Sequence, residues 1–268
     1  MYLQKNKWQV CCCIALGLTG HLAAQTNDVT SVSGASYAPI VAPGSIVSAW
    51  GSGFNATTVA ANTTTSGAQM LQLPQTLGSV SLSLKDTLAQ TTAPLLYMVS
   101  PGQVNYVIEK AALGPATLTV VSGNSSPKTG AVQISNVAPA IYTADSSGSG
   151  VPAGSVYRVS QSNAVALDNT FQSGGSTYSP KPFSVSGSDK VFLVLYGTGI
   201  RNRSLNPAKA TIGDVVVQVP YAGPQSNYPG FDQINVGPLP ASLAGTGATD
   251  FVLYVDGVPS NTVRIAIQ

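Results

Sequence analysis

The sequence predicts an all-β protein built from β-sandwiches, and three observations lead to this prediction. Of its 268 residues, 44% are hydrophobic and only 8% are charged, and Glu109 is its one glutamate, a composition poorly suited to long exposed helices. Gly 27 and Pro 18 make it rich in turns without reaching the range of disordered chains. In the segment Gly78–Leu84, apolar residues alternate with serines, which is typical of a half-buried strand.

Short apolar stretches recur between clusters of Gly, Pro, Ser and Asn in both halves of the chain. In the first half, the predicted strands are Gly44–Trp50, Gly78–Leu84, Gln103–Ile108, Ala116–Val121 and Ala131–Ile134. In the second half, they are Lys190–Tyr196, Asp214–Val219, Gln233–Val236, Phe251–Val255 and Thr262–Ile267. Many short strands separated by turn signals favour a sandwich architecture.

The first 24 residues have the pattern of a secretory signal peptide. Lys5 and Lys7 precede an apolar run from about Trp8 to Leu18, and small residues end the segment before Gln25. A membrane anchor is the alternative, but the run is too short to span a bilayer as a helix. We therefore expect an exported chain at the cell surface, in the extracellular space or in the periplasm, with no membrane span after cleavage.

Cleavage would change the chemistry available to the mature chain. The three cysteines, Cys11 to Cys13, and the one histidine, His21, all lie in the leader. Removal of two lysines from the 12 basic residues leaves 10, against 10 acidic residues. We therefore expect no disulfide, no cofactor, no zinc site built from His or Cys, and no nucleic-acid partner, because there is no basic excess.

The two halves of the chain look like two copies of one unit. Trp50-Gly-Ser-Gly-Phe matches Tyr196-Gly-Thr-Gly-Ile, Leu77-Gly-Ser-Val matches Ile212-Gly-Asp-Val, and Gln103-Val-Asn matches Gln233-Ile-Asn. The predicted first sandwich covers residues 25–137 and includes an exposed Thr-rich loop, Asn55–Gln69. The second covers residues 189–268, and residues 138–188 form a structured connector with a hairpin around Ser155–Phe171.

Six segments resemble the Solibacter-type uncharacterised C-terminal domain family, whose modules occur in exported bacterial proteins. They are Ala35–Phe54, Ala93–Ile108, Ala138–Ala144, Val194–Ile200, Gln233–Pro240 and Val255–Ile267. The paired units are also similar to IPT/TIG-type immunoglobulin-like domains, in which a Gly-x-Gly-aromatic turn follows the second strand. The resemblance implies two immunoglobulin-like β-sandwiches and no catalytic residues.

The Gly-x-Gly segments, Gly51/Gly53 and Gly197/Gly199, have two interpretations. A dinucleotide-binding loop needs a third glycine and a following helix, and neither segment supplies them. Glycines that permit positive φ in a tight turn are the better interpretation.

Paired amides alternate with apolar residues in both copies, at Gln103/Asn105 and Gln233/Asn235. Amides on one strand face could bind sugar hydroxyls, but they also satisfy backbone groups at turns and edges. Their recurrence in both copies favours the architectural role.

Catalysis finds little support in the sequence. After cleavage no histidine remains to activate a serine, and the acidic residues are scattered, which weakens a carboxylate pair for glycoside cleavage. A calcium site at Asp145 would need more clustered oxygen ligands. We therefore predict that the protein is not an enzyme and holds no metal.

The remaining candidates for recognition are the aromatic residues Tyr221, Tyr228 and Phe231 of a Pro/Gly-rich loop. Exposed rings there could stack on sugars or anchor a partner, whereas buried rings would plug the end of the second sandwich. We predict a non-enzymatic structural or adhesive module that acts through loops and strand edges, with a surface protein, a polysaccharide or a second copy as partner. The alternative is a carbohydrate-binding module that uses these three residues.

Overall fold

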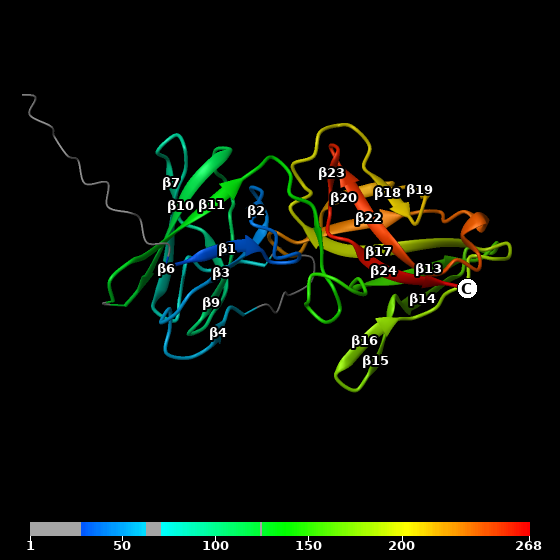
Figure 1. Ribbon diagram of the computed structural model, residues 1–268, viewed down its shortest axis with the longest axis horizontal. Helices are drawn as coiled ribbons and strands as arrows, with labels where there is room; N and C mark the ends of the chain where they lie inside the picture. Colours follow the sequence, from blue (N-terminus) through cyan, green and yellow to red (C-terminus); the bar gives the residue numbers. More distant parts are fainter. Residues whose placement is uncertain (1–27, 63–70, 124) are drawn as a thin grey trace, which may run out of the picture.

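The computed structural model describes residues 28–62, 71–123 and 125–268, and it confirms the all-β prediction (Figure 1). Two β-sandwiches follow one another along the long axis of the molecule. All ten predicted strands are present, and the described residues contain one short 3-10 turn, η1 (Ala241–Leu243), as their only helical element. None of the described helical segments is long and apolar enough to cross a membrane. The predicted signal peptide lies outside the described residues.

The first sandwich pairs a five-stranded sheet with a six-stranded sheet. The five-stranded sheet has the order β1 (Thr30–Ser33), β3 (Ile46–Trp50), β9 (Gln103–Val107), β8 (Leu95–Val99) and β4 (Val59–Ala60). The other has the order β2 (Ile40–Val41), β11 (Lys128–Ile134), β10 (Gly114–Ser122), β6 (Val80–Lys85) and β5 (Thr76–Leu77), and β7 (Thr91–Thr92) also pairs with β6. Pairing is antiparallel except between β2 and β11.

Alternation along β6 builds the first core. Val80, Leu82 and Leu84 are buried, whereas the intervening serines are half-buried. They pack with inward residues of the facing sheet, including Val104 and Tyr106 of β9. Because the side-chain period of a strand is two, this pattern in the sequence was enough to set which face turns inward.

The second sandwich is built in the same way. One sheet has the order β14 (Val165–Asn169), β13 (Gly154–Val159), β17 (Lys190–Thr198), β21 (Asp232–Val236) and β20 (Tyr221–Pro224), and β12 (Ala140–Ile141) also pairs with β17. The facing sheet has the order β19 (Val215–Gln218), β18 (Lys209–Ile212), β22 (Gly247–Val255) and β23 (Val258–Pro259), and β24 (Val263–Ile267) also pairs with β22.

The segment 138–188, predicted as a connector, is largely part of the second sandwich. Strands β12 and β13 both pair with β17, and the predicted hairpin is formed by β13 and β14. Val156 of β13 is buried in the second core. The only strands of this segment outside the main sheets are β15 (Phe171–Gly174) and β16 (Thr177–Pro180), which form a hairpin that projects from the body of the molecule (Figure 1). The connector prediction was wrong because its strands are short and their pairing partner, β17, lies further along the chain.

The internal repeat is visible in the sheets, with one exception. Strands β3 and β9 are neighbours in the first sandwich, as β17 and β21 are in the second, with Trp50 opposite Gln103 and Tyr196 opposite Gln233. The exception is the matched pair of turns at Gly78, between β5 and β6, and at Gly213, between β18 and β19, which are not equivalent. In the first sandwich the strand after the turn, β6, pairs with the central strand β10, whereas in the second the strand before it, β18, pairs with β22.

The predicted Thr-rich loop, Asn55–Gln69, is described only as far as residue 62. Within that part, the loop contains the short strand β4, which pairs with β8, and Ala61 is buried. This stretch is therefore partly a sheet edge, and the rest of the predicted loop lies outside the described residues.

Candidate functional site

The Gly-x-Gly segments form turns in which the two glycines have different tasks. Gly53 and Gly199 have φ of 62° and 76°, in the left-handed region that favours glycine. Gly51 and Gly197 instead leave room for groups that pack closely against the turn. A Cβ at Gly51 would lie 2.3 Å from the ring of Phe54 and 2.8 Å from the carbonyl oxygen of Asp28. A Cβ at Gly197 would lie 2.3 Å from the carbonyl oxygen of Ala140. A helix follows neither turn, so these glycines shape the backbone and no phosphate cradle is formed.

The paired amides occupy the outer face of the sandwich in both copies and make the same contact. Nε2 of Gln103 donates to Oδ1 of Asn105, and Nε2 of Gln233 donates to Oδ1 of Asn235, each at 2.8 Å. In the first copy, the hydroxyl of Ser48 also donates to Asn105 Oδ1 at 2.9 Å. The two amides of each pair therefore orient one another along their own strand, and an aromatic residue of the adjacent strand lies opposite each glutamine.

The aromatic loop has its three residues in different surroundings. Tyr228 packs into an apolar cluster of the first sandwich that contains Leu71, Leu73 and Val107. The ring of Phe231 stacks on Tyr196 and on Tyr142, with centroids 5.2 Å and 5.5 Å apart. Tyr221 is 39% exposed, and its hydroxyl donates to the carbonyl of Pro224 at 2.5 Å. The structure therefore does not bring the three rings together on one open surface.

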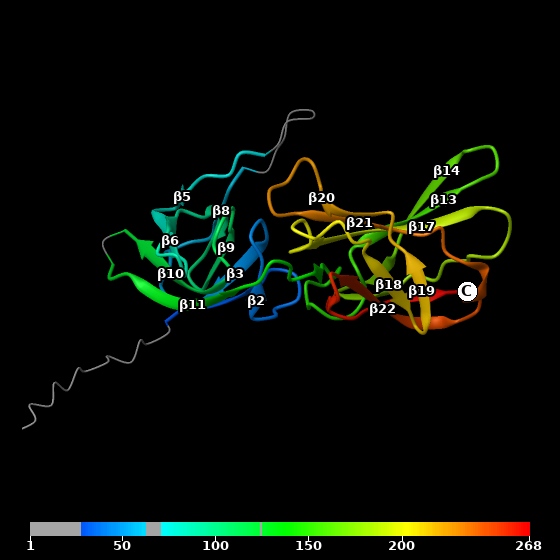
Figure 2. The same ribbon diagram turned by 90° about the horizontal axis from the view of Figure 1, so that it is seen from above.

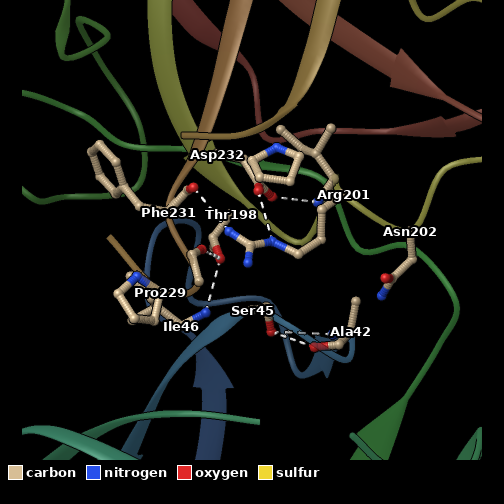
Figure 3. Close-up of polar contacts among 12 residues, drawn as sticks. Ala42, Ser45, Ile46, Thr198, Arg201, Asn202, Pro229, Phe231 and Asp232 are labelled. Carbon is tan, nitrogen blue, oxygen red and sulfur yellow. Dashed lines mark hydrogen bonds and ion pairs between the residues drawn. The ribbon is translucent and has the colours of Figure 1, made fainter. Parts of the chain in front are cut away.

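Tyr228 and Phe231 belong to a region that we call the junction, where β3 and β8 of the first sandwich meet β17 and residues 225–231 of the second. Thr198 lies at its centre and is 1% exposed (Figure 3). Its hydroxyl accepts a hydrogen bond from the amide of Ile46 at 2.8 Å and donates one to the carbonyl of Gly230 at 2.7 Å. One side chain thus connects the two sandwiches by satisfying a backbone group on each side.

Further hydrogen bonds across the junction involve residues from several elements. The hydroxyl of Tyr97, on β8, donates to the carbonyl of Pro229 at 2.8 Å. The amide of Leu71 donates to the carbonyl of Asn227 at 2.9 Å, and Nδ2 of Asn202 donates to the carbonyl of Pro43 at 2.5 Å. Because these bonds flank Thr198 on more than one side, they resist bending of one sandwich against the other.

An ion pair supports the second sandwich beside the junction. Asp232 is fully buried, and its Oδ1 accepts from Nε of Arg201 at 2.9 Å while its Oδ2 accepts from the amide of Ile200 at 2.8 Å (Figure 3). Burial raises the pKa of Asp232 above its usual range, although Arg201 and the amide act to lower it. The Arg201 guanidinium also donates to the carbonyl of Phe231, so this pair holds the end of the aromatic loop.

Two tyrosines at the junction have raised pKa values. Burial raises the pKa of Tyr97 to about 12, against a smaller lowering by Arg201. Burial also raises the pKa of Tyr142, whose hydroxyl has no hydrogen-bond partner within the described part of the chain. Both groups therefore remain neutral well above neutral pH, as expected of structural tyrosines.

A groove of about 400 Å3 lies along the junction, and Glu109, Arg201, Gln225 and Tyr228 are among its lining residues. Elsewhere, Asp145 accepts hydrogen bonds from the amide and the hydroxyl of Ser147, so a local turn uses the carboxylate considered for calcium. Among the described residues, no group of three His, Cys, Asp or Glu side chains is placed to hold a metal ion.

Sequence reasoning missed Thr198, Arg201 and Asp232 as residues of the junction. A partial signal existed for Thr198, because it is the variable residue of the second Gly-x-Gly turn. Its counterpart in the first turn, Ser52, is exposed and contacts Lys128 instead. The matched positions therefore differ in both backbone and partners: Thr198 ends strand β17, whereas Ser52 lies in a bend after β3.

No family model matches the sequence, and no curated protein matches it. Among solved structures, one similar chain is the SGBP-B protein of the Bacteroides ovatus mixed-linkage glucan utilization locus, in complex with a mixed-linkage heptasaccharide. It is 14% identical with a TM-score of 0.31, and the match covers 86% of this chain and 44% of that chain. This chain thus spans less than half the length of that protein, and a likeness of this size carries no functional assignment.

Proposed function

We propose that this protein is a non-enzymatic, exported structural or adhesive module whose two sandwiches act as one rigid body. The observation that carries the proposal is the hydrogen-bonded bridge of Thr198 between Ile46 and Gly230. A flexible tether would leave such groups to water, whereas here they are paired and Thr198 is buried.

Rigidity suits a protein that must present a surface at a fixed distance and angle. Domains joined by few contacts move relative to one another by default, and a well-packed interface suppresses that motion. At the junction, Tyr228 adds apolar contact with the first sandwich to the hydrogen bonds of Thr198 and Tyr97. The two sandwiches would then meet a partner as a preorganised pair, which lowers the entropic cost of binding.

Exposed edges and faces supply the surfaces for such contacts. Every residue of β14 is exposed, including Val165 at 59% and Leu167 at 62%. An edge strand with apolar side chains is suited to pair or pack with another chain. The same features would allow a second copy of this protein as partner.

Small-angle X-ray scattering and residual dipolar couplings of the mature chain test rigidity. We expect one conformer with the observed arrangement to fit both data sets, and a broad ensemble of angles between the sandwiches would contradict the proposal. Binding is tested by titrating labelled protein onto isolated cell envelopes of the source organism. Saturable binding without change to the envelope material is the expected result, and absence of binding to envelopes and to a second copy would refute the adhesive role.

A further inference from the structure

The outer face of the β14-β13-β17-β21-β20 sheet carries aromatic and amide side chains in register. Leu167, Tyr157 and Phe192 lie opposite one another across β14, β13 and β17. In the adjacent row, Val194 of β17 lies opposite Asn235, which in turn lies opposite Tyr221. The next row pairs Tyr196 with Gln233. We call this surface the platform: Tyr157, Leu167, Phe192, Val194, Tyr196, Tyr221, Gln233 and Asn235.

Strand alternation explains why these side chains face outward. On β17, Val191, Leu193 and Leu195 are buried in the second core, so the residues between them, such as Phe192, must point to the other face. All platform residues are half-buried or exposed. Figure 2 shows this sheet as the upper layer of the second sandwich, with β18, β19 and β22 beneath it.

The chemistry of the platform fits a sugar chain. Aromatic rings offer flat apolar surfaces, and amides offer both a donor and an acceptor for hydroxyl groups. The bond from Gln233 Nε2 to Asn235 Oδ1 fixes both amides. It leaves Gln233 Oε1 and Asn235 Nδ2 without a partner in the described part of the chain, so one acceptor and one donor remain for a ligand beside the rings of Tyr196 and Tyr221.

Charge indicates which class of polysaccharide the platform would take. None of the eight platform residues is charged. Cations lie at its rim: Lys190 is opposite Val159 in the row beyond Tyr157, and Arg201 and Arg203 line a pocket beside Tyr221. Because the platform itself is uncharged and the cations lie at its rim, an acidic polymer would find no counter-charge along most of its length, and the platform favours a neutral polymer. Five strands at a spacing of roughly 4.8 Å make the platform about 19 Å wide, which is an extended surface suited to a chain of several sugars.

We propose that the platform binds a neutral polysaccharide; this inference rests on the proposed adhesive function and names its ligand class. The site differs from the aromatic loop that the sequence suggested, because Tyr228 and Phe231 are used at the junction and Tyr221 is the one loop residue that contributes. Phe231 instead stacks on Tyr196 and closes one end of the platform.

The corresponding face of the first sandwich supplies a matched control. Trp50 lies opposite Gln103 just as Tyr196 lies opposite Gln233, and it is 40% exposed. Its row and the adjacent one contain Thr30 and Ser48 in place of further rings, and Ile46, at the position of Phe192, packs into the junction. The second ring of this face, Tyr97 of β8, is used at the junction, so the face offers one free aromatic residue where the platform has several.

The experiment measures binding of the full mature chain to cellulose, xylan, mannan and a soluble β-glucan by pull-down and affinity electrophoresis, with polygalacturonate as the acidic comparison. We expect at least one neutral polymer to bind. Tyr157→Ala and Asn235→Ala should each weaken that binding by about ten-fold, the loss of one central contact. Trp50→Ala and Tyr178→Ala, on the exposed hairpin, should leave it unchanged, and circular dichroism should show that all four variants are folded.

Several outcomes would overturn the inference: no binding to any neutral polymer of the panel, binding to polygalacturonate alone, or full binding by both platform variants. Envelope binding separates this inference from the proposed function. If labelled protein still binds envelopes but binding is abolished by protease and unaffected by Tyr157→Ala, the adhesive role stands with a protein partner and the platform proposal fails. If binding resists protease and is lost in Tyr157→Ala, both stand.

Discussion

Replacing Thr198 by valine should uncouple the two sandwiches. Valine has nearly the shape of threonine, so the change creates no cavity, but it removes the hydroxyl that pairs with the amide of Ile46 and the carbonyl of Gly230. Each buried polar group left without a partner costs about 1–3 kcal/mol. Because Ile46 is only partly buried, water can hydrogen-bond to its freed amide and offset part of this cost. We therefore expect the free energy of unfolding to fall by about 2–4 kcal/mol.

Equilibrium urea denaturation followed by two probes measures this effect. Trp50 lies in the first sandwich, and Trp8 belongs to the leader expected to be removed, so tryptophan fluorescence would report the first sandwich alone. Circular dichroism reports the strands of both. In the parent chain we expect the two transitions to coincide, and in Thr198→Val we expect them to separate, because the junction no longer couples the two sandwiches.

Two control variants make the result specific. Thr198→Ser keeps the hydroxyl and should retain coincident transitions. Ser52→Ala changes the equivalent, exposed position of the first repeat and should stay within about 0.5 kcal/mol of the parent. If Thr198→Val unfolds at the parent midpoint with coincident transitions, then the Thr198 bridge does not hold the sandwiches together and the proposed rigidity loses its basis.

Three further perturbations test other parts of the structure. Gly199→Ala should destabilise the protein by more than about 2 kcal/mol in chemical denaturation, because φ is 76° and the new Cβ would lie 2.1 Å from a carbonyl oxygen. Gly245 has the same φ, but a Cβ there would have nothing within 4 Å, so the smaller loss of stability expected for Gly245→Ala measures the backbone strain alone. Equal losses of stability in the two variants would show that the close carbonyl contact at position 199 contributes nothing. The raised pKa of Tyr97 means that the folded state holds this proton more tightly than the unfolded state. Its stabilising contribution is complete below the ordinary value of 10.0 and is lost as the pH rises through about 12, so unfolding free energies should fall above pH 10.0. The fall should be smaller in Tyr97→Phe, which has no phenolic proton, and an identical pH profile would show that this group is not responsible. The double variant Val165→Thr/Leu167→Thr should change stability by less than about 0.5 kcal/mol, since both side chains are exposed. Sedimentation velocity should show weaker self-association if copies meet at this edge, and an unchanged dimer fraction would exclude β14 as the contact.

Local pattern in the sequence was sufficient for the strands and several of the turns. Alternation in Gly78–Leu84 correctly predicts which side of β6 is buried, because neighbouring side chains of a strand always point to opposite faces. The positive φ of Gly53 and Gly199 was likewise predictable, because glycine adopts that conformation without steric cost. The cross-strand equivalence of Gln103 and Gln233 followed from the repeat.

Contacts between distant segments were decided only by the tertiary structure. Ile46 and Thr198 are 152 residues apart, and no pattern around either residue indicates that one will hydrogen-bond to the other. For the same reason the sequence left open whether the rings of the aromatic loop are exposed for binding or buried at the end of the second sandwich. Packing placed Tyr228 in an apolar cluster of the first sandwich and Phe231 between two rings. Local sequence sets which side of a strand is apolar, but the partner that covers it depends on how both sandwiches pack, because burial is a property of the whole chain.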